Sequence, residues 1–436
     1  MLDIVPMYRK AIEQLKKWQK SKDRKPLLLT WARQVWKTFL LRQFWNECYS
    51  NMIYLNFENI APEIAQLFEN DLDPKKILTN LEIYFKQEIT PWKTLLIFDE
   101  IQSNPRALTS LKYFNELAWE YHIIASGSLL WIALHKETSF PVGKIEFLHL
   151  EPMDFEEFLL ANGEEKLIKL YQKNPNQIFD GRLYEYMKQY LFVGWMPEIV
   201  QSWITEQDVE KVELLQWNIL QSYRYDFSKH TNEQMTKRLT QIWEAIPLQF
   251  AKENDKFIRW ILRQWARAKD YEIALQWLVD SGLVRKVNRV KRWDKLPLLA
   301  YQEDSAFKLY FLDVWLLRKL ADIPSNVLMN KYSIFSEYNW LFAEQFVLQN
   351  MSKYRFFYRT SNANAEVDFI TQISEKIIPI EVKSGENTKS KSLKIYREKY
   401  HPIVSIRFSM LDFIKQDWLV NIPLYLIFCF DELIDN

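Results

Sequence analysis

The chain has 436 residues, of which 48% are apolar and 26% are charged, which is ordinary for a globular protein of about two to four domains. Its formal net charge is only +1, so any contact with nucleic acid must come from a local patch and not from the field of the whole protein. Two cysteines, Cys48 and Cys429, exclude a disulfide framework and a cysteine-based zinc site.

Nothing in the sequence indicates a membrane segment. No apolar run approaches the ~18 residues that a spanning helix needs, and the first residues lack the apolar core of a signal peptide. We therefore expect a cytoplasmic protein that makes no membrane contact.

A phosphate-binding motif comes early in the chain. After a helical pattern at 8–22, an apolar strand (27–30) leads through a tight loop into a helix that opens at Lys37 and Thr38. This is the layout of a P-loop, G-x-x-x-x-G-K-[ST], whose backbone N–H groups hold the phosphates of ATP. Lys37 would pair with the β- and γ-phosphates, and Thr38 would bind Mg²⁺. The expected nucleotide-binding set is Trp31, Ala32, Arg33, Gln34, Val35, Trp36, Lys37 and Thr38.

Both glycine positions of this motif are tryptophan. The side chain of Trp36 should block the approach of the backbone to the phosphate, and Trp31 should strain the turn. One alternative is a strand, turn and helix that merely contain Lys-Thr. Another is a protein that has lost nucleotide binding.

A second motif supports the nucleotide site. The apolar strand 94–98 ends in Asp99 and Glu100, the Walker B pattern, in which Asp99 belongs to the Mg²⁺ shell and Glu100 orients or activates water. The strand 122–126 places Ser126, and beyond it Ser128, where a polar side chain could sense the γ-phosphate. The alternatives are an exposed acidic strand end and an ordinary turn serine.

Strands and helices alternate over the first part of the chain. A strand at 51–57, one or two helices at 62–89, a helix at 108–120 and the buried strands predict a parallel α/β sheet for residues 1–160. Residues 161–232 are predicted to be a mostly helical lid, rich in aromatic residues.

Residues 233–300 have a winged-helix pattern: helices, a glycine stop, then a charged hairpin. The basic segment of this hairpin comprises Arg285, Lys286, Arg289, Lys291, Arg292 and Lys295. It could contact the phosphate backbone of DNA, or it could be a solvated hairpin or face another protein.

The last part, residues 301–436, is predicted to be strand-rich α/β. Asp368 ends one strand, Glu381-Val-Lys383 lies on the next, and Glu344 lies on the preceding helix. Carboxylates can hold Mg²⁺, and a lysine can stabilise charge during phosphodiester hydrolysis. The alternative is a nuclease-like fold that binds without cleaving.

Several segments resemble one family, the prokaryotic AAA-type ATPases that carry a C-terminal domain of unknown function. These segments are Ala32–Val35 with Lys37-Thr38, Phe98–Gln102, Ala125–Ser128, 151–158, 266–282 and Phe307–Asp313. The resemblance covers nearly the whole chain. It implies a P-loop NTPase core that uses ATP, a winged helix, and a C-terminal module similar to the PD-(D/E)xK, or restriction-endonuclease-like, fold.

The resemblance also connects the tryptophans with the glycines. The family pattern expects glycine at seven positions that are tryptophan here (31, 36, 131, 195, 265, 315 and 340), and Trp45, Trp92, Trp119, Trp260 and Trp293 are further candidates. Trp45 is expected near the end of the P-loop helix, and Trp92 in a turn. Exchanging these 12 would change 18 tryptophans and 7 glycines to 6 and 19, nearer to ordinary usage. We therefore predict that the gene uses UGA codons for glycine at these positions.

Overall fold

The computed structural model describes residues 7–31, 37–127, 141–177, 179–251, 268–325, 339–360, 366–383 and 390–435. The chain divides into two compact units. Unit 1 is Met1–Pro152 with Asp280–Gly282, and unit 2 is Met153–Val279 with Leu283–Asn436.

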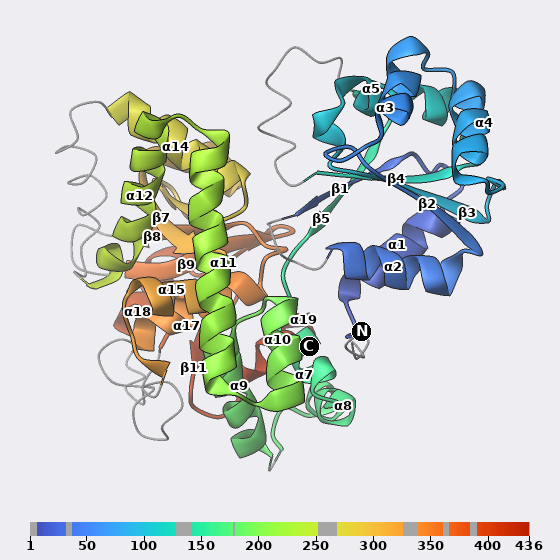
Figure 1. The fold of residues 1–436 in the computed structure, drawn as a ribbon. Helices are drawn as coiled ribbons and strands as arrows, with labels where there is room; N and C mark the ends of the chain where they lie inside the picture. Colours follow the sequence, from blue (N-terminus) through green and yellow to red (C-terminus); the bar gives the residue numbers. More distant parts are fainter. Residues whose placement is uncertain are drawn as a thin grey trace. The chain divides into compact units, whose positions relative to one another are not determined.

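Unit 1 is a parallel five-stranded sheet with helices on both faces (Figure 1). In the sheet the strands follow the order β2-β3-β4-β1-β5, so β4 lies between β1 and β3. Helices α1 and α2 cover one face, and α3, α4 and α5 cover the other. The strands are β1 (Leu27–Trp31), β2 (Asn51–Asn56), β3 (Thr94–Asp99), β4 (His122–Ser126) and β5 (Glu146–Leu150), and the helices are α1 (Lys10–Lys20), α2 (Lys37–Cys48), α3 (Pro62–Asn70), α4 (Pro74–Phe85) and α5 (Pro105–Leu117).

The sequence explains these elements. All residues of β3 and β4 are buried, as expected for central strands covered on both faces. Helices α3, α4 and α5 each begin with a proline, whose fixed φ suits the first helical turn. The side chains of Asp73 and Asn104 cap α4 and α5 by accepting hydrogen bonds from the backbone amides of Lys75 and Ala107. The predicted parallel α/β sheet is therefore confirmed.

Unit 2 combines helices with a mixed eight-stranded sheet, in the order β12-β13-β11-β10-β9-β8-β6-β7. Its strands are β6 (Val284–Val290), β7 (Gln302–Phe311), β8 (Phe356–Thr360), β9 (Glu366–Ile373), β10 (Lys376–Val382), β11 (Ser405–Ser409), β12 (Ile414–Lys415) and β13 (Leu419–Pro423). Its helices are α7 (Phe155–Ala161), α8 (Glu165–Lys173), α9 (Asp180–Val193), α10 (Pro197–Glu206), α11 (Val209–His230), α12 (Glu233–Ala251), α14 (Ala268–Asp280), α15 (Val314–Leu320), α17 (Asn339–Asn350), α18 (Lys391–Tyr400) and α19 (Phe430–Asp435).

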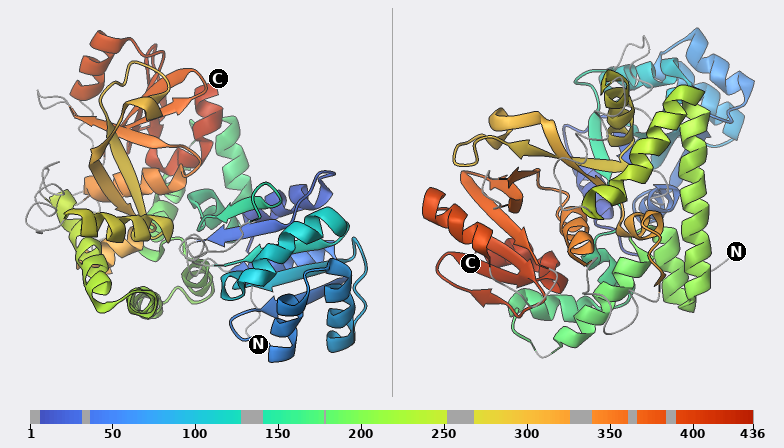
Figure 2. Two further views of the ribbon diagram at one scale, coloured as in Figure 1. Left: turned by 90° about the horizontal axis from the view of Figure 1, so that it is seen from above. Right: turned by 90° about the vertical axis from the view of Figure 1, so that its left-hand side faces the viewer.

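The predicted charged hairpin is formed by β6 and β7. Strand β6 also pairs in parallel with β8, through Asn288 and Phe357, so the hairpin continues the C-terminal sheet (Figure 2). Residues 252–267 of the segment with the winged-helix pattern lie outside the described residues. A division of this unit into lid, winged helix and nuclease-like module stays a prediction.

Candidate functional site

The candidate site lies at the carboxyl edge of the sheet in unit 1. The register of the strands pairs Asn56 with Asp99 and Leu29 with Ser126, and it pairs the residues just before Asp99 and Ser126 with each other. The ends of β1, β2, β3 and β4 therefore lie at one level. In parallel sheets this edge is where ligands bind.

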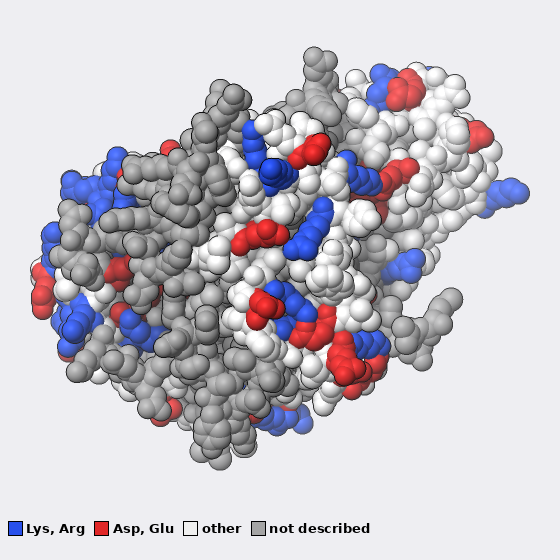
Figure 3. Space-filling view, turned by 60° about the vertical axis from the view of Figure 1, so that its left-hand side comes forward, with Lys and Arg blue, Asp and Glu red and all other residues white. Residues whose placement is uncertain are grey.

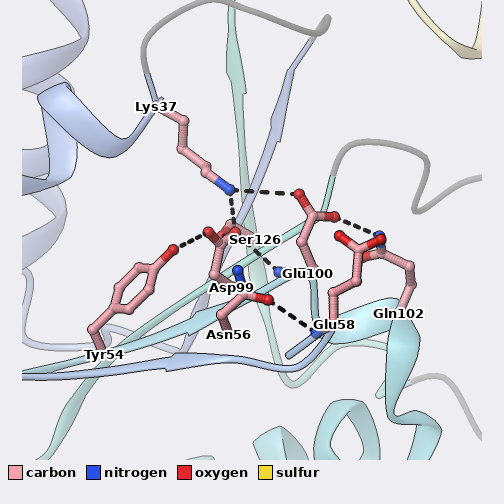
Figure 4. Close-up of polar contacts among 8 residues, drawn as sticks. All are labelled: Lys37, Tyr54, Asn56, Glu58, Asp99, Glu100, Gln102 and Ser126. Carbon is pink, nitrogen blue, oxygen red and sulfur yellow. Dashed lines mark hydrogen bonds and ion pairs between the residues drawn. The ribbon is translucent and has the colours of Figure 1, made fainter. Parts of the chain in front are cut away.

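Lys37, the first residue of α2, connects the P-loop helix to the end of β3. Its ammonium group forms a buried ion pair with Asp99, and its Nζ lies 3.8 Å from Oε1 of Glu100 (Figure 4). The structure therefore brings Lys37 next to Asp99 and Glu100, which follow it by 62 or more residues in the sequence.

Asp99 receives more hydrogen bonds than the ion pair alone. Ser126 Oγ donates to its Oδ1 over 2.7 Å, the hydroxyl of Tyr54 donates to its Oδ2, and the backbone amide of Glu100 donates over 2.9 Å. Burial opposes ionisation of Asp99, but the charge of Lys37 and the hydrogen bonds from Lys37, Tyr54 and Ser126 hold its pKa below the ordinary value. Asp99 is therefore a carboxylate at neutral pH, as a Mg²⁺ ligand must be.

Glu100 has an unusual backbone conformation. Its φ of +49° and ψ of +44° lie in the left-handed region, which costs a residue with a side chain about 1–2 kcal/mol. Strained residues of this kind cluster at functional sites. Its Oε2 accepts a hydrogen bond of 2.6 Å from Nε2 of Gln102. This contact orients the carboxylate that the sequence assigns to water activation.

The other predicted nucleotide-binding residues are described only in part. Thr38 is exposed in the first turn of α2, and the backbone of Trp31 pairs with Leu150 of β5. Ala32, Arg33, Gln34, Val35, Trp36 and Ser128 lie outside the described residues. The structure therefore describes the lysine and the carboxylates of the predicted site, but not the loop between β1 and α2.

Sequence reasoning missed Tyr54 and Gln102. Buried Ile53, Leu55 and Phe57 alternate with less buried Tyr54 and Asn56 along β2, so the period of two was visible in the sequence. Which partner Tyr54 meets depends on the pairing of β2 with β3, and that pairing is a property of the tertiary structure.

The tryptophan positions have different environments. Trp92 has a φ of +65°, in the left-handed region that glycine adopts without strain. Trp195 and Trp315 are buried, and their indole N–H groups find no acceptor among the described residues. Trp45 lies in the last turn of α2, which continues to Cys48, so it is near the end of this helix as expected but not at the position after the helix that glycine usually takes.

The basic segment is less available than its composition suggests. Arg285 donates to the backbone oxygen of Leu348 over 3.1 Å, and Arg289 pairs with Glu303 over 2.9 Å. Lys291 and Arg292 are exposed, although Arg292 pairs with Asp294 over 3.0 Å. Figure 3 shows positive and negative side chains beside one another over the described part of one face, which differs from a continuous basic surface.

The predicted nuclease-like residues lie in one neighbourhood of unit 2. Glu381 is buried on β10, and Nζ of Lys383 lies 2.9 Å from its Oε1. Asp368 lies near the start of β9, so the expectation that it ends a strand is wrong. It accepts a hydrogen bond of 2.7 Å from the amide of Val382, and burial together with the nearby charge of Glu344 raises its pKa well above the ordinary value. Among the described residues, no group of three or more metal-binding side chains is arranged to hold a metal ion.

Comparisons with known proteins agree with the fold. Residues 23–159 match the family described as an AAA domain, residues 184–327 match a domain of unknown function (DUF8612), and residues 341–425 match another (DUF4143). These matches confirm the predicted AAA domain and the C-terminal domains of unknown function. No curated protein matches the chain. In the described part of the chain, no helix is long and apolar enough to cross a membrane.

Several solved structures are similar to the chain at low identity. The Walker-type ATPase PABY2304 of Pyrococcus abyssi is 15% identical, with a TM-score of 0.47 over 74% of this chain and 99% of that chain. The Aeropyrum pernix ORC1 protein in complex with DNA is 11% identical, with a TM-score of 0.32 over 74% and 94%. The Thermotoga maritima RuvB Holliday junction branch migration motor is 12% identical, with a TM-score of 0.29 over 65% and 90%.

Proposed function

We propose that unit 1 binds ATP with Mg²⁺ and hydrolyses it when positions 31 and 36 carry glycine, and that this cycle acts on a C-terminal half that binds DNA or protein. The observation that supports this most directly is the convergence of Lys37, Asp99 and Glu100 at the carboxyl edge of a parallel sheet. A strand end with one buried ion pair could be structural. Three groups with the charges that phosphoryl transfer needs, in an AAA domain, favour a nucleotide site.

The residues fit Mg²⁺ and ATP chemically. Asp99 is an ionised carboxylate beside the hydroxyl of Ser126, and Thr38 opens the P-loop helix. Asp99 and Thr38 would hold Mg²⁺, which supplies neutralisation of the phosphate charge. Lys37 would turn from Asp99 to the phosphates, and Glu100 would accept the proton of the attacking water. Ser126 would report on the γ-phosphate from the end of β4.

A second candidate is an adaptor that has lost nucleotide binding and acts through its C-terminal half alone. The specific observation in its favour is the pair of tryptophans at 31 and 36, where the P-loop requires glycine. In this case the ion pair between Lys37 and Asp99 would be a permanent structural contact. DNA or protein binding would then involve the exposed Lys291 and Arg292 without control by ATP.

Calorimetry with Mg·ATP separates the two candidates. We compare the chain as written with a variant that carries Trp31→Gly and Trp36→Gly. For an ATPase, the chain as written shows no binding, and the double-glycine variant binds and turns over ATP. In that variant, Glu100→Gln should lower turnover by about 10²-fold or more while binding persists, because Glu100 acts on water and not on the nucleotide.

Glu63→Gln is the matched control for the loss of a carboxylate, because Glu63 is exposed on α3 and lies outside the site. Its turnover should equal that of the double-glycine parent. Absence of ATP binding by the folded double-glycine variant would favour the adaptor. Unchanged turnover after Glu100→Gln would remove the assigned role of Glu100 while leaving nucleotide binding in place.

A further inference from the structure

Unit 2 contains a cluster of acidic side chains that form ion pairs with two lysines. The carboxylates are Glu344 of α17, Glu366 and Asp368 of β9, and Glu381 of β10, and the lysines are Lys308 of β7 and Lys383 after β10. Lys308 was not expected from the sequence. Its ammonium group forms an ion pair with Glu366, and Nζ lies 3.7 Å from Oε2 of Glu344. It also lies over the ring of Tyr358, 5.2 Å from the centroid.

The carboxylates that the nuclease pattern assigns to a metal are held by other groups. Oε2 of Glu344 accepts a hydrogen bond of 2.7 Å from the hydroxyl of Tyr310, and Lys308 lies beside the same oxygen. Asp368 accepts from a backbone amide, and Lys383 lies against Oε1 of Glu381. Oε2 of Glu381 is buried and has no hydrogen-bond partner in the described part of the chain.

This arrangement does not fit Mg²⁺. The ion requires close to six oxygen ligands at ~2.1 Å, usually with carboxylates directly on the metal. With Lys308 in place, the described residues contain no group of three acidic or other metal-binding side chains in such an arrangement. A divalent ion bound by Glu344 would also be repelled by the positive charge of Lys308, whose Nζ lies 3.7 Å from the buried carboxylate of Glu344.

We infer that Lys308 occupies the cation position of this acidic cluster, so that the C-terminal unit holds no divalent metal there and does not cleave phosphodiesters by a metal-dependent route. The ammonium group meets the need for positive charge that the carboxylates create. Burial would favour a neutral lysine, but the charges of Glu344, Tyr310, Glu366 and Asp368 together outweigh it and keep the pKa of Lys308 well above the ordinary value. The inference concerns unit 2 and is independent of the ATP hydrolysis proposed for unit 1.

The test counts bound Mn²⁺ on the full chain by electron paramagnetic resonance. We compare the wild type with Asp368→Asn, Lys308→Met and the double variant, which all share an unchanged unit 1. The wild type and Asp368→Asn should bind the same number of ions. Lys308→Met, which keeps the length of the side chain without its charge, should gain one Mn²⁺ per chain. The double variant should lose that gain.

Lys286→Met is the matched control, because Lys286 lies on the neighbouring strand β6, over the ring of Phe307 and outside the cluster. It should gain no ion. A wild type that loses one Mn²⁺ on Asp368→Asn would overturn the inference, as would a folded Lys308→Met variant that gains none. If Lys308→Met fails to fold without metal, the comparison of the wild type with Asp368→Asn still tests the inference. Equal Mn²⁺ counts support it, and one ion fewer in Asp368→Asn overturns it.

Discussion

The hydroxyl of Tyr54 offers a sharp test of the electrostatics at the end of β3. Tyr54→Phe removes one donor from Asp99 and leaves the ring in place. A hydrogen bond to a charged group contributes about 1.5–3 kcal/mol to stability. Asp99 keeps Lys37, Ser126 and the amide of Glu100 as donors, so we expect the lower end of this range, about 1.5 kcal/mol.

The assay must report on unit 1 alone, because a chain of two units need not unfold in one transition. Hydrogen exchange of the amides in β2 and β3 does this. A loss of about 1.5 kcal/mol corresponds to exchange roughly tenfold faster through local opening. Tyr84→Phe is the control, since Tyr84 is 49% exposed on α4, and its exchange should not change.

The pH dependence follows from the lowered pKa of Asp99. A carboxyl group whose pKa is lower in the folded state contributes stability that is present above its unfolded pKa and is lost as pH falls through the folded one. The effect of Tyr54→Phe should therefore be constant between about pH 5 and 8 and shrink only below about pH 4. An effect that grows between pH 5 and 8, or unchanged exchange in β2 and β3, would refute the reasoning.

Three further predictions concern other parts of the chain. Asp313→Ala should destabilise unit 2 by about 2–4 kcal/mol in thermal unfolding, because two backbone amides lose a buried acceptor, and Asp313→Asn should cost less. In chemical unfolding, the free energy of unfolding should be higher for Trp92→Gly than for Trp119→Gly by about 1–2 kcal/mol. The two residues are about equally exposed, and of the two only Trp92 has a positive φ. If the C-terminal half binds DNA, Lys291→Ala should lower the salt slope of binding by about one, whereas Arg285→Ala should not, because Arg285 is bonded inward.

The coding DNA tests the prediction about glycine directly. UGA codons at positions 31, 36 and 315, with UGG at Trp18 or Trp277, are the expected result. The left-handed backbone at Trp92 fits this prediction, because a large side chain is strained there and glycine is not. UGG at all of these positions would show that the tryptophans are genuine.

The sequence by itself determined the sheet of unit 1 and the charged residues at its carboxyl edge. Apolar strands that end in polar residues predict a parallel sheet, and parallel strands bring their carboxyl ends to one edge. Lys37, Asp99 and Ser126 could therefore be placed together before any coordinates, and the structure places them in contact. The spacing of Asp368 and Glu381 likewise predicted a local pair, because β9 and β10 are consecutive antiparallel strands.

Only the tertiary structure decided what surrounds these groups. Tyr54 reaches Asp99 through the register of β2 on β3, and Lys308 reaches Glu344 and Glu366 from a strand that is distant along the chain. Strand alternation tells which residues share a face, but it does not tell which strands become neighbours. The partner of a buried charge depends on which strands are neighbours in the sheet. The same pairing decides whether a lysine lies within an acidic cluster, as Lys308 does here.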